Sequence, residues 1–217
     1  MGNAPARAHR SSLIHPATEL RRASQEIGSG VFATARIPRG TIVWVLDRLD
    51  RMLSPAQVES LGSRYHEMLD HFSYLNARGA RVLCWDLARW VNHSCDANAL
   101  STGWDFDIAV RDIEAGEEIT NDYACLNLEE SFTCHCKKPG CRGTVYPKDF
   151  DELADVWDQQ VRDAFPDVAR VEQPMWQWLP RQREVRAAMF DPTRLPSIRR
   201  HQMVVPPVPA RRSASAR

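Results

Sequence analysis

Three cysteines lie within eight residues of this chain, and no other feature restricts its folding as strongly. Cys134, Cys136 and Cys141 follow the spacing Cys-x-Cys-x4-Cys, and Pro139-Gly140 bends the chain before the last of them. Three thiolates in one tight turn are typical of a zinc site. Three incidental thiols or a redox pair are the alternatives, but the spacing favours metal.

A structural zinc ion takes four ligands in a tetrahedron, so this loop lacks one ligand. His135 is a candidate, although in an extended loop its side chain would point away from its two cysteine neighbours. Cys125 is another candidate. The residues of this segment leave the choice open.

The composition argues against several classes of protein. The chain has 217 residues and six cysteines, and residues 1–12 lack the apolar segment of a secretory signal. We therefore expect reduced thiols in an intracellular protein, cytoplasmic or nuclear and not secreted. No apolar run approaches the roughly 20 residues of a membrane span. The formal net charge is zero, which gives no reason to expect nucleic acid as a direct ligand. Nothing in the sequence indicates an oligomeric state.

Short strands and turns dominate the first half of the chain. β-branched and aromatic residues flank two similar turns, Ile37-Pro38-Arg39-Gly40 and Ile113-Glu114-Ala115-Gly116, and predict two strand-turn-strand units. A hairpin is expected around Ala77-Arg78-Gly79. A helix is predicted from Ser54, as its N-cap, to about Asp70. Many short strands with one inserted helix predict an α+β domain.

The composition changes after Cys141. Leu153, Trp157, Val161 and Phe165 recur at four-residue spacing and predict an amphipathic helix, which a second helix follows over residues 181–190. We expect this extension to pack on the preceding domain, although closing a substrate groove or forming a dimer is also open. The expected divisions are a disordered N-terminus (1–15), the main domain (16–130), a zinc-binding segment (131–146), a helical extension (147–195) and a disordered tail (196–217).

Four motifs occur in a fixed order along the chain. They are Gly28-Ser29-Gly30, Asn92-His93-Ser94-Cys95, Thr120-Asn121-Asp122-Tyr123 and the cysteine group. Over about residues 20 to 145, this order resembles the SET-domain protein-lysine methyltransferases with a zinc-binding post-SET tail. The resemblance implies a β-rich SET fold, in which short sheets surround a pseudoknot and a post-SET zinc loop follows. The helical C-terminal extension lies outside it.

The resemblance also implies a cofactor, a substrate and a role for each motif. Methyl groups would pass from S-adenosylmethionine to a lysine of a protein substrate, a histone or another basic protein. Tyr123 would be the catalytic tyrosine. The donor would be held by Gly28, Ser29, Gly30, Asn92, His93 and Tyr123. Zinc would be bound by Cys95, Cys134, Cys136 and Cys141, so that Cys95 supplies the fourth ligand.

Two departures from the family pattern affect the substrate site. Asn121 stands where a Phe or Tyr often tunes how many methyl groups are added. A second active-site tyrosine is missing near Val45-Leu46, and Tyr65, Tyr74 or Trp104 could line the channel instead. The alternative to an enzyme is a non-catalytic SET-like zinc scaffold that acts in protein interactions. A zinc protein that binds nucleic acid is a weaker reading, since the chain has no net positive charge.

Overall fold

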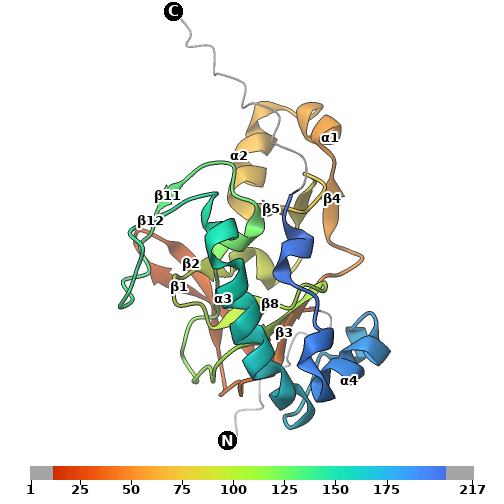
Figure 1. The fold of residues 1–217 in the computed structure, drawn as a ribbon. Helices are drawn as coiled ribbons and strands as arrows, with labels where there is room; N and C mark the ends of the chain where they lie inside the picture. Colours follow the sequence, from red (N-terminus) through yellow and green to blue (C-terminus); the bar gives the residue numbers. More distant parts are fainter. Residues whose placement is uncertain (1–11, 204–217) are drawn as a thin grey trace, which may run out of the picture.

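The computed structural model describes residues 12–203 as an α+β domain built from five small sheets (Figure 1). Apart from β7 and β10, all the paired strands are antiparallel. The strands are β1 (Thr18–Ser24), β2 (Gly28–Ala33), β3 (Ile42–Val45), β4 (Arg51–Leu53), β5 (Ser73–Leu75), β6 (Arg81–Leu83), β7 (Asn92–His93), β8 (Ala99–Ser101), β9 (Phe106–Ala109), β10 (Thr120–Asn121), β11 (Phe132–Thr133) and β12 (Thr144–Val145).

The helices fall into two groups. Two α-helices and two short 3-10 helices lie within or beside the sheets, namely α1 (Pro55–Glu59), α2 (Ser63–Phe72), η1 (Leu87–Trp90) and η2 (Tyr123–Leu126). The C-terminal part is helical throughout, with α3 (Asp149–Ala164), η3 (Phe165–Ala169), η4 (Trp176–Trp178), α4 (Gln182–Phe190), η5 (Pro192–Arg194) and η6 (Ile198–His201). No helix within residues 12–203 has both the length and the apolar character needed to cross a membrane.

The sheet β3-β9-β8 lies between two apolar clusters. Alternate residues of a strand face opposite sides of a sheet, and here both sides are apolar. Val43 and Ala109 belong to a smaller cluster with β2 and the two turns. Ile42 and Ile108, beside them in the chain, belong to a larger cluster that includes the C-terminal helices. This sheet is therefore the layer on which both halves of the molecule pack.

The two turns that resemble each other in sequence meet in space. Ile37 and Ile113 form an isolated antiparallel bridge, and their backbone groups exchange hydrogen bonds of 2.8 and 2.9 Å. Both side chains are fully buried. Each strand-turn-strand unit contributes strands to different sheets: β2 pairs with β1, whereas β3 pairs with β9. The units predicted from the sequence therefore exist, but their strands do not pair within a unit.

The helix predicted from Ser54 to about Asp70 is in fact two helices. Ser54 is the N-cap of α1 and forms a capping box with Gln57. Gly62 then adopts an extended conformation and precedes α2. Glycine inside a helix is less favourable than alanine by about 1 kcal/mol, which favours a break at this position. The predicted hairpin is confirmed, because β5 pairs with β6 around Gly79.

The C-terminal extension packs on the β3-β9-β8 sheet, as expected from the apolar stripe. Trp157, Val161 and Phe165 are buried in the larger cluster together with residues of that sheet. The first turn also fits closely against η3: Gly40 has a φ of +85°, and a Cβ atom there would lie 2.8 Å from the backbone nitrogen of Val168. In Figure 1, α3 runs along the front of the molecule, and α4 lies to one side of it.

Order extends further toward both ends than the sequence predicted. Leu13 and Ile14 are buried, and the backbone of Leu13 accepts a 3.0 Å hydrogen bond from Val45. At the other end, Ile198 is buried, and its backbone N–H donates to Asp158. Residues 12–15 and 196–203 therefore do not belong to disordered segments. The remainder of both predicted segments, residues 1–11 and 204–217, lies outside the described residues.

Candidate functional site

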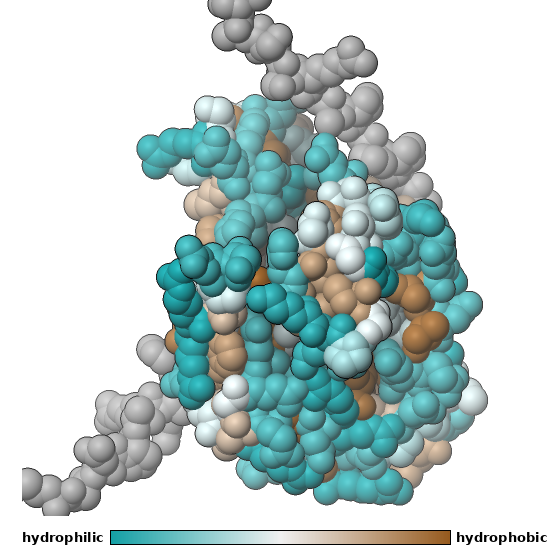
Figure 2. Space-filling view, turned by 90° about the vertical axis from the view of Figure 1, so that its left-hand side faces the viewer, coloured by the Kyte–Doolittle hydropathy of each residue, from teal (hydrophilic) through white to brown (hydrophobic). Residues whose placement is uncertain are grey.

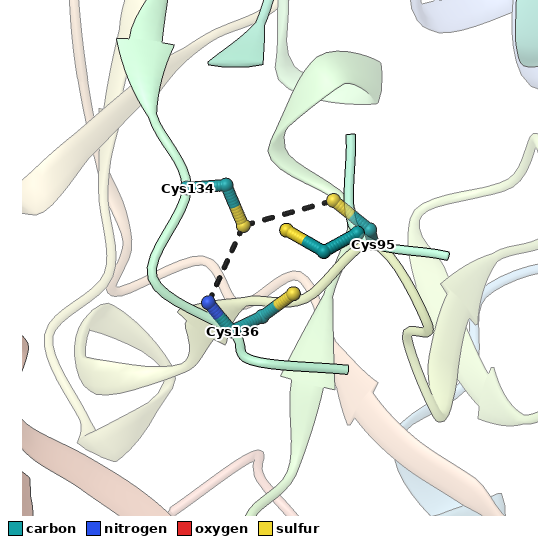
Figure 3. Close-up of side chains that lie close together, drawn as sticks. Cys95, Cys134 and Cys136 are labelled. Carbon is teal, nitrogen blue, oxygen red and sulfur yellow. Dashed lines mark hydrogen bonds between the residues drawn. The ribbon is translucent and has the colours of Figure 1, made fainter. Parts of the chain in front are cut away.

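The four candidate zinc ligands come together at one point. The sulfur atoms of Cys95, Cys134, Cys136 and Cys141 all lie within 4.8 Å of one another. In Figure 3, the sulfur atoms of the three labelled cysteines point toward one another, and the Sγ atoms of Cys95 and Cys134 are 3.7 Å apart. A tetrahedral zinc ion with Zn–S bonds of ~2.3 Å would place its sulfur ligands about 3.8 Å apart. This donor set fits a structural zinc ion.

Several N–H groups point at these sulfur atoms. The backbone N–H of Cys136 donates to Cys134 at 3.4 Å, and that of Gly143 donates to Cys141 at 3.4 Å. The Nε–H of Arg142 donates to Cys95 at 3.4 Å. Such donors favour the negatively charged thiolate form, which is the form that binds metal.

The other two candidate ligands are excluded by position. His135 is exposed and is not part of the sulfur cluster. Cys125 is buried elsewhere, where its thiol donates to the side-chain oxygen of Asn121 at 3.4 Å. Cys95 completes the set because it follows β7, which leads directly into the loop beside the cysteine-rich segment.

The Gly-Ser-Gly motif lies beside Asn92. Gly28 and Gly30 belong to β2, and the amide of Asn92 donates to the carbonyl oxygen of Ser29 at 2.9 Å. The same amide donates to Glu118 at 2.7 Å. At Gly30, an added Cβ atom would collide with Glu118 and would lie 2.8 Å from the Asn92 amide. Only a residue without a side chain therefore fits at this buried position beside Asn92 and Glu118.

Glu118 was not singled out from the sequence. Ile119 donates a 2.7 Å backbone hydrogen bond to Val31, and Glu118 itself forms a bridge with Phe32. This pairing with β2 brings the carboxylate to the glycine loop. Its only sequence signal was its position within the acidic segment before Tyr123.

Tyr123 and His93 are held next to each other by the one parallel strand pair. β7 pairs with β10, with Asn121 opposite His93, and η2 begins at Tyr123. The backbone N–H of Tyr123 donates to Nδ1 of His93 at 3.1 Å, and its hydroxyl donates to the carbonyl oxygen of Val91 at 2.7 Å. The motif containing Asn92 and the motif ending at Tyr123 thus form one structural unit.

Burial keeps both side chains neutral. It raises the pKa of Tyr123, and the nearby Glu118 carboxylate raises it further. Burial, followed by the charge of Arg142, lowers the pKa of His93 to about 4. At neutral pH, Tyr123 therefore has a hydroxyl that can donate or accept, and His93 carries no charge. Asp122 has a structural role, since it accepts a 2.7 Å hydrogen bond from Arg142.

A cavity of about 920 Å³ opens beside Tyr123. Two of the three aromatic residues expected as possible channel residues, Tyr74 and Trp104, line it, whereas Tyr65 does not and is 41% exposed. Trp44 also lines the cavity and packs edge-on against Tyr74 at 6.5 Å. The C-terminal extension contributes Ile198 and His201 to the wall. Leu46 lies at the cavity where the family pattern would place a tyrosine.

The inner wall also carries a carboxylate that sequence reasoning missed. Asp107 lines the cavity, and its Oδ2 accepts a 2.8 Å hydrogen bond from the amide of Asn121. Burial raises the pKa of Asp107 to about 7, against the lowering effect of hydrogen bonds from Asn121 and Ser101. In the sequence, Asp107 is one of several acidic residues, and only the sheet register reveals where it lies.

Comparisons with known proteins agree with this arrangement. The family model described as SET domain matches residues 28–124. This stretch of the chain resembles SET domains. Among curated relatives, aligned stretches of this chain are 29% identical to "Histone-lysine N-methyltransferase, H3 lysine-36 specific" of Saccharomyces cerevisiae, over 66% of this chain and 20% of the relative. They are 27% identical to "Histone-lysine N-methyltransferase Set2" of Drosophila melanogaster, over 56% of this chain and 6% of the relative.

The chain spans about a fifth or less of the length of these two relatives. Among solved structures, the methyltransferase domain of human Histone-lysine N-methyltransferase SETMAR matches 56% of this chain and 55% of its own, with 18% identity and a TM-score of 0.40.

Proposed function

We propose that this chain is a SET-domain protein-lysine N-methyltransferase that uses S-adenosylmethionine. One observation carries the proposal: the glycine loop with Asn92, the Tyr123 hydroxyl and an aromatic cavity occur side by side. Relatives named histone-lysine N-methyltransferases support the reaction class. The residues of each motif receive the following roles.

The donor is bound by Gly28, Ser29, Gly30, Asn92 and His93. S-adenosylmethionine supplies a methyl group on a positively charged sulfur, which an amine can attack. The backbone of this glycine loop would offer polar groups to the donor. Gly30 lets the loop lie against Asn92 and Glu118, because a larger residue would collide with both. The Asn92 amide and the Glu118 carboxylate lie next to this backbone and can bind the charged amino-acid part of the donor.

Tyr123 aims the substrate amine. A free lysine has a pKa near ~10.4 and is protonated at neutral pH, so an attacking amine must lose a proton before transfer. The buried neutral hydroxyl of Tyr123 donates its proton to Val91, so its oxygen can accept a hydrogen bond from the reacting nitrogen. Much of the rate enhancement would come from holding the amine in line with the methyl group.

Zinc has a structural role in this proposal. The ligands Cys134, Cys136 and Cys141 belong to the tail segment, and Cys95 follows directly after the Asn92-His93 strand. A metal ion at this point fastens the tail to the donor-binding segment, so zinc binding and assembly of the site are coupled.

The substrate is a lysine-bearing basic protein in this proposal, with histones as the first candidates because of the relatives' names. The cavity walls carry Asp70, Asp105, Glu129 and Glu130 besides Asp107. Of the lining arginines, Arg81 is paired with Asp70 and Glu129 at 2.7 and 2.5 Å. This acidic surrounding favours a cationic peptide and disfavours nucleic acid. An intracellular location stays a prediction.

A non-catalytic scaffold is the second candidate. It is favoured by Leu46, which lines the cavity at a position where the family pattern has a tyrosine. Such a protein would bind zinc, with or without the donor, and would act through its partners.

An assay of methyl transfer from labelled S-adenosylmethionine into a histone mixture and a whole-cell extract distinguishes the enzyme from the non-catalytic scaffold. The zinc-loaded wild type should label lysines, and Tyr123→Phe should lower the rate by about 100-fold or more, because the hydroxyl is lost from the reacting centre. Tyr65→Phe is the matched control, since Tyr65 is exposed and lies outside the cavity. Donor binding without label in any pool would favour the scaffold, and absence of donor binding would refute the enzymatic function.

A further inference from the structure

Asp107 occupies an unusual place for a carboxylate. It lies in β9, the middle strand of the β3-β9-β8 sheet, between Trp44 and Ser101 of the neighbouring strands. The residues on either side of it, Phe106 and Ile108, are fully buried. The Asp107 side chain faces the opposite way and lines the large cavity.

The carboxylate is held in place by its neighbours. Its Oδ2 accepts the 2.8 Å hydrogen bond from Asn121, whose own side-chain oxygen accepts from the Cys125 thiol at 3.4 Å. Asn121 is only 6% exposed. Because both ends of the Asn121 amide are engaged, the amide can present only its N–H group to Asp107.

No cation compensates this carboxylate. Within residues 12–203, no arginine, lysine or histidine forms an ion pair with Asp107, and its pKa is shifted by burial and by two neutral hydrogen-bond donors. Three ionisable groups that interact with Asp107 are also uncharged at neutral pH. Burial raises the pKa of Tyr74, of Cys84 and of Cys125, and the Asp107 carboxylate raises each further. An unpaired buried carboxylate is costly, so its presence at a cavity wall indicates a cationic ligand.

The surrounding rings suit the same ligand. Trp44 and Tyr74 line the cavity near Asp107, and Tyr123 lies two residues beyond Asn121 in the chain. Aromatic faces attract a cation whether or not it carries N–H groups. A carboxylate adds a requirement for N–H donors, because its strongest contacts with an ammonium group are charge-assisted hydrogen bonds.

We propose that Asp107, oriented by Asn121, binds the ammonium group of the target lysine inside the cavity and makes the site prefer lysines that still carry N–H groups. The inference rests on the proposed methyltransferase function and deepens it by naming the residue that selects the substrate. Each methyl group added to the lysine nitrogen removes one possible hydrogen bond to Asp107. Trimethyl-lysine, with none left, is therefore the poorest of the cationic forms.

A binding experiment tests this without turnover. The zinc-loaded full chain is titrated with Nα-acetyl-lysine methylamide, its trimethyl-lysine counterpart and its norleucine counterpart, and NMR shifts of the cavity residues are followed. The wild type should bind the lysine probe at least about tenfold more tightly than the norleucine probe, with the trimethyl probe between them. Asp107→Asn, which keeps the size of the side chain, should abolish the preference for lysine over trimethyl-lysine.

Asp105→Asn is the matched control. Asp105 lines the same cavity two residues earlier but is exposed, and the substitution removes the same formal charge. It should leave the order of the three probes unchanged. Equal binding of the lysine and trimethyl-lysine probes by the wild type would overturn the inference, even if Asp107→Asn failed to fold. An unchanged preference in a folded Asp107→Asn variant would overturn it as well.

Failure of the inference and failure of the proposed function give different results. If the wild type methylates lysines and Asp107→Asn does so with an unchanged KM, the inference is wrong and the function stands. If no substrate pool is methylated but the lysine probe binds in a way that depends on Asp107, the cation site is supported and the enzymatic function is not.

Discussion

Asp107→Asn should stabilise the fold, and the gain should grow with pH. In the folded protein, burial raises the pKa of Asp107 from the ordinary value of 3.8 to about 7. Between these values, the folded chain holds a proton that the unfolded chain has released, so the free energy of unfolding falls as the pH rises. Above the folded pKa, both states are ionised and the penalty stays constant. Asparagine does not titrate and escapes this penalty.

The size of the effect follows from the shift. One pKa unit corresponds to 1.36 kcal/mol. The pH range that contributes runs from pH 5.5 to the pKa of Asp107 in the folded protein, about 7, and is about 1.5 units wide. The advantage of Asp107→Asn over the wild type should therefore increase by about 2 kcal/mol between pH 5.5 and pH 8. Asp107 lines an open cavity and is largely but not fully buried, so solvent screening reduces this figure to about 1–2 kcal/mol.

Urea unfolding followed by tryptophan fluorescence, at pH 5.5 and at pH 8 with zinc present, measures this difference. Other titrating groups, including the cysteines, occur in both proteins and cancel in the comparison. Asp105→Asn, in which an exposed carboxylate of the same cavity is replaced, is the matched control, and its stability difference at each pH is subtracted from that of Asp107→Asn. A stability difference for Asp107→Asn that is the same at both pH values would refute the reasoning, because the carboxylate would then be paired or well solvated.

Three further substitutions test the site and the core. Gly30→Ala should weaken S-adenosylmethionine binding by about tenfold or more in calorimetry, since the new Cβ displaces the Asn92 amide 2.8 Å away. Cys95→Ser should lower the zinc content found by metal analysis as much as Cys136→Ser does, because both supply one of four converging sulfur atoms. Trp157→Ala should destabilise the fold by about 3–5 kcal/mol, because this 4% exposed side chain fills the core between the sheet and α3.

Each substitution has a matched control in the chain. Gly62→Ala adds a Cβ where nothing lies within 4 Å and should leave donor binding intact. His135→Ala removes the exposed alternative ligand and should keep zinc bound; loss of zinc there, with full zinc in Cys95→Ser, would move the fourth ligand to His135. Val156→Ala, at a position that is 50% exposed, should change stability by no more than about 0.5 kcal/mol. An equal effect of Val156→Ala and Trp157→Ala would contradict the packing argument.

Local patterns predicted the elements that depend on neighbouring residues. The capping box at Ser54, the hairpin at Gly79 and the four-residue repeat of α3 all appear where the sequence placed them. The single helix predicted from Ser54 to about Asp70 is interrupted before Gly62. The apolar spacing continues across this glycine and hides the break between the two helices. The strand β1 was missed because three of its seven residues are charged and its middle residues are exposed, and only its pairing with β2 defines it.

The sequence by itself determined the identity and order of the candidate site residues, because each motif is a contiguous signal: the glycines, the Asn92-His93 pair, Tyr123 and the cysteine group. Only the tertiary structure decided which distant groups meet. It placed Cys95 with the three tail cysteines, and it carried Asp107 and Trp44 to the cavity beside Asn121. Contacts of this kind depend on sheet register and on the parallel pairing of β7 with β10, and neither leaves a periodic signal in the chain.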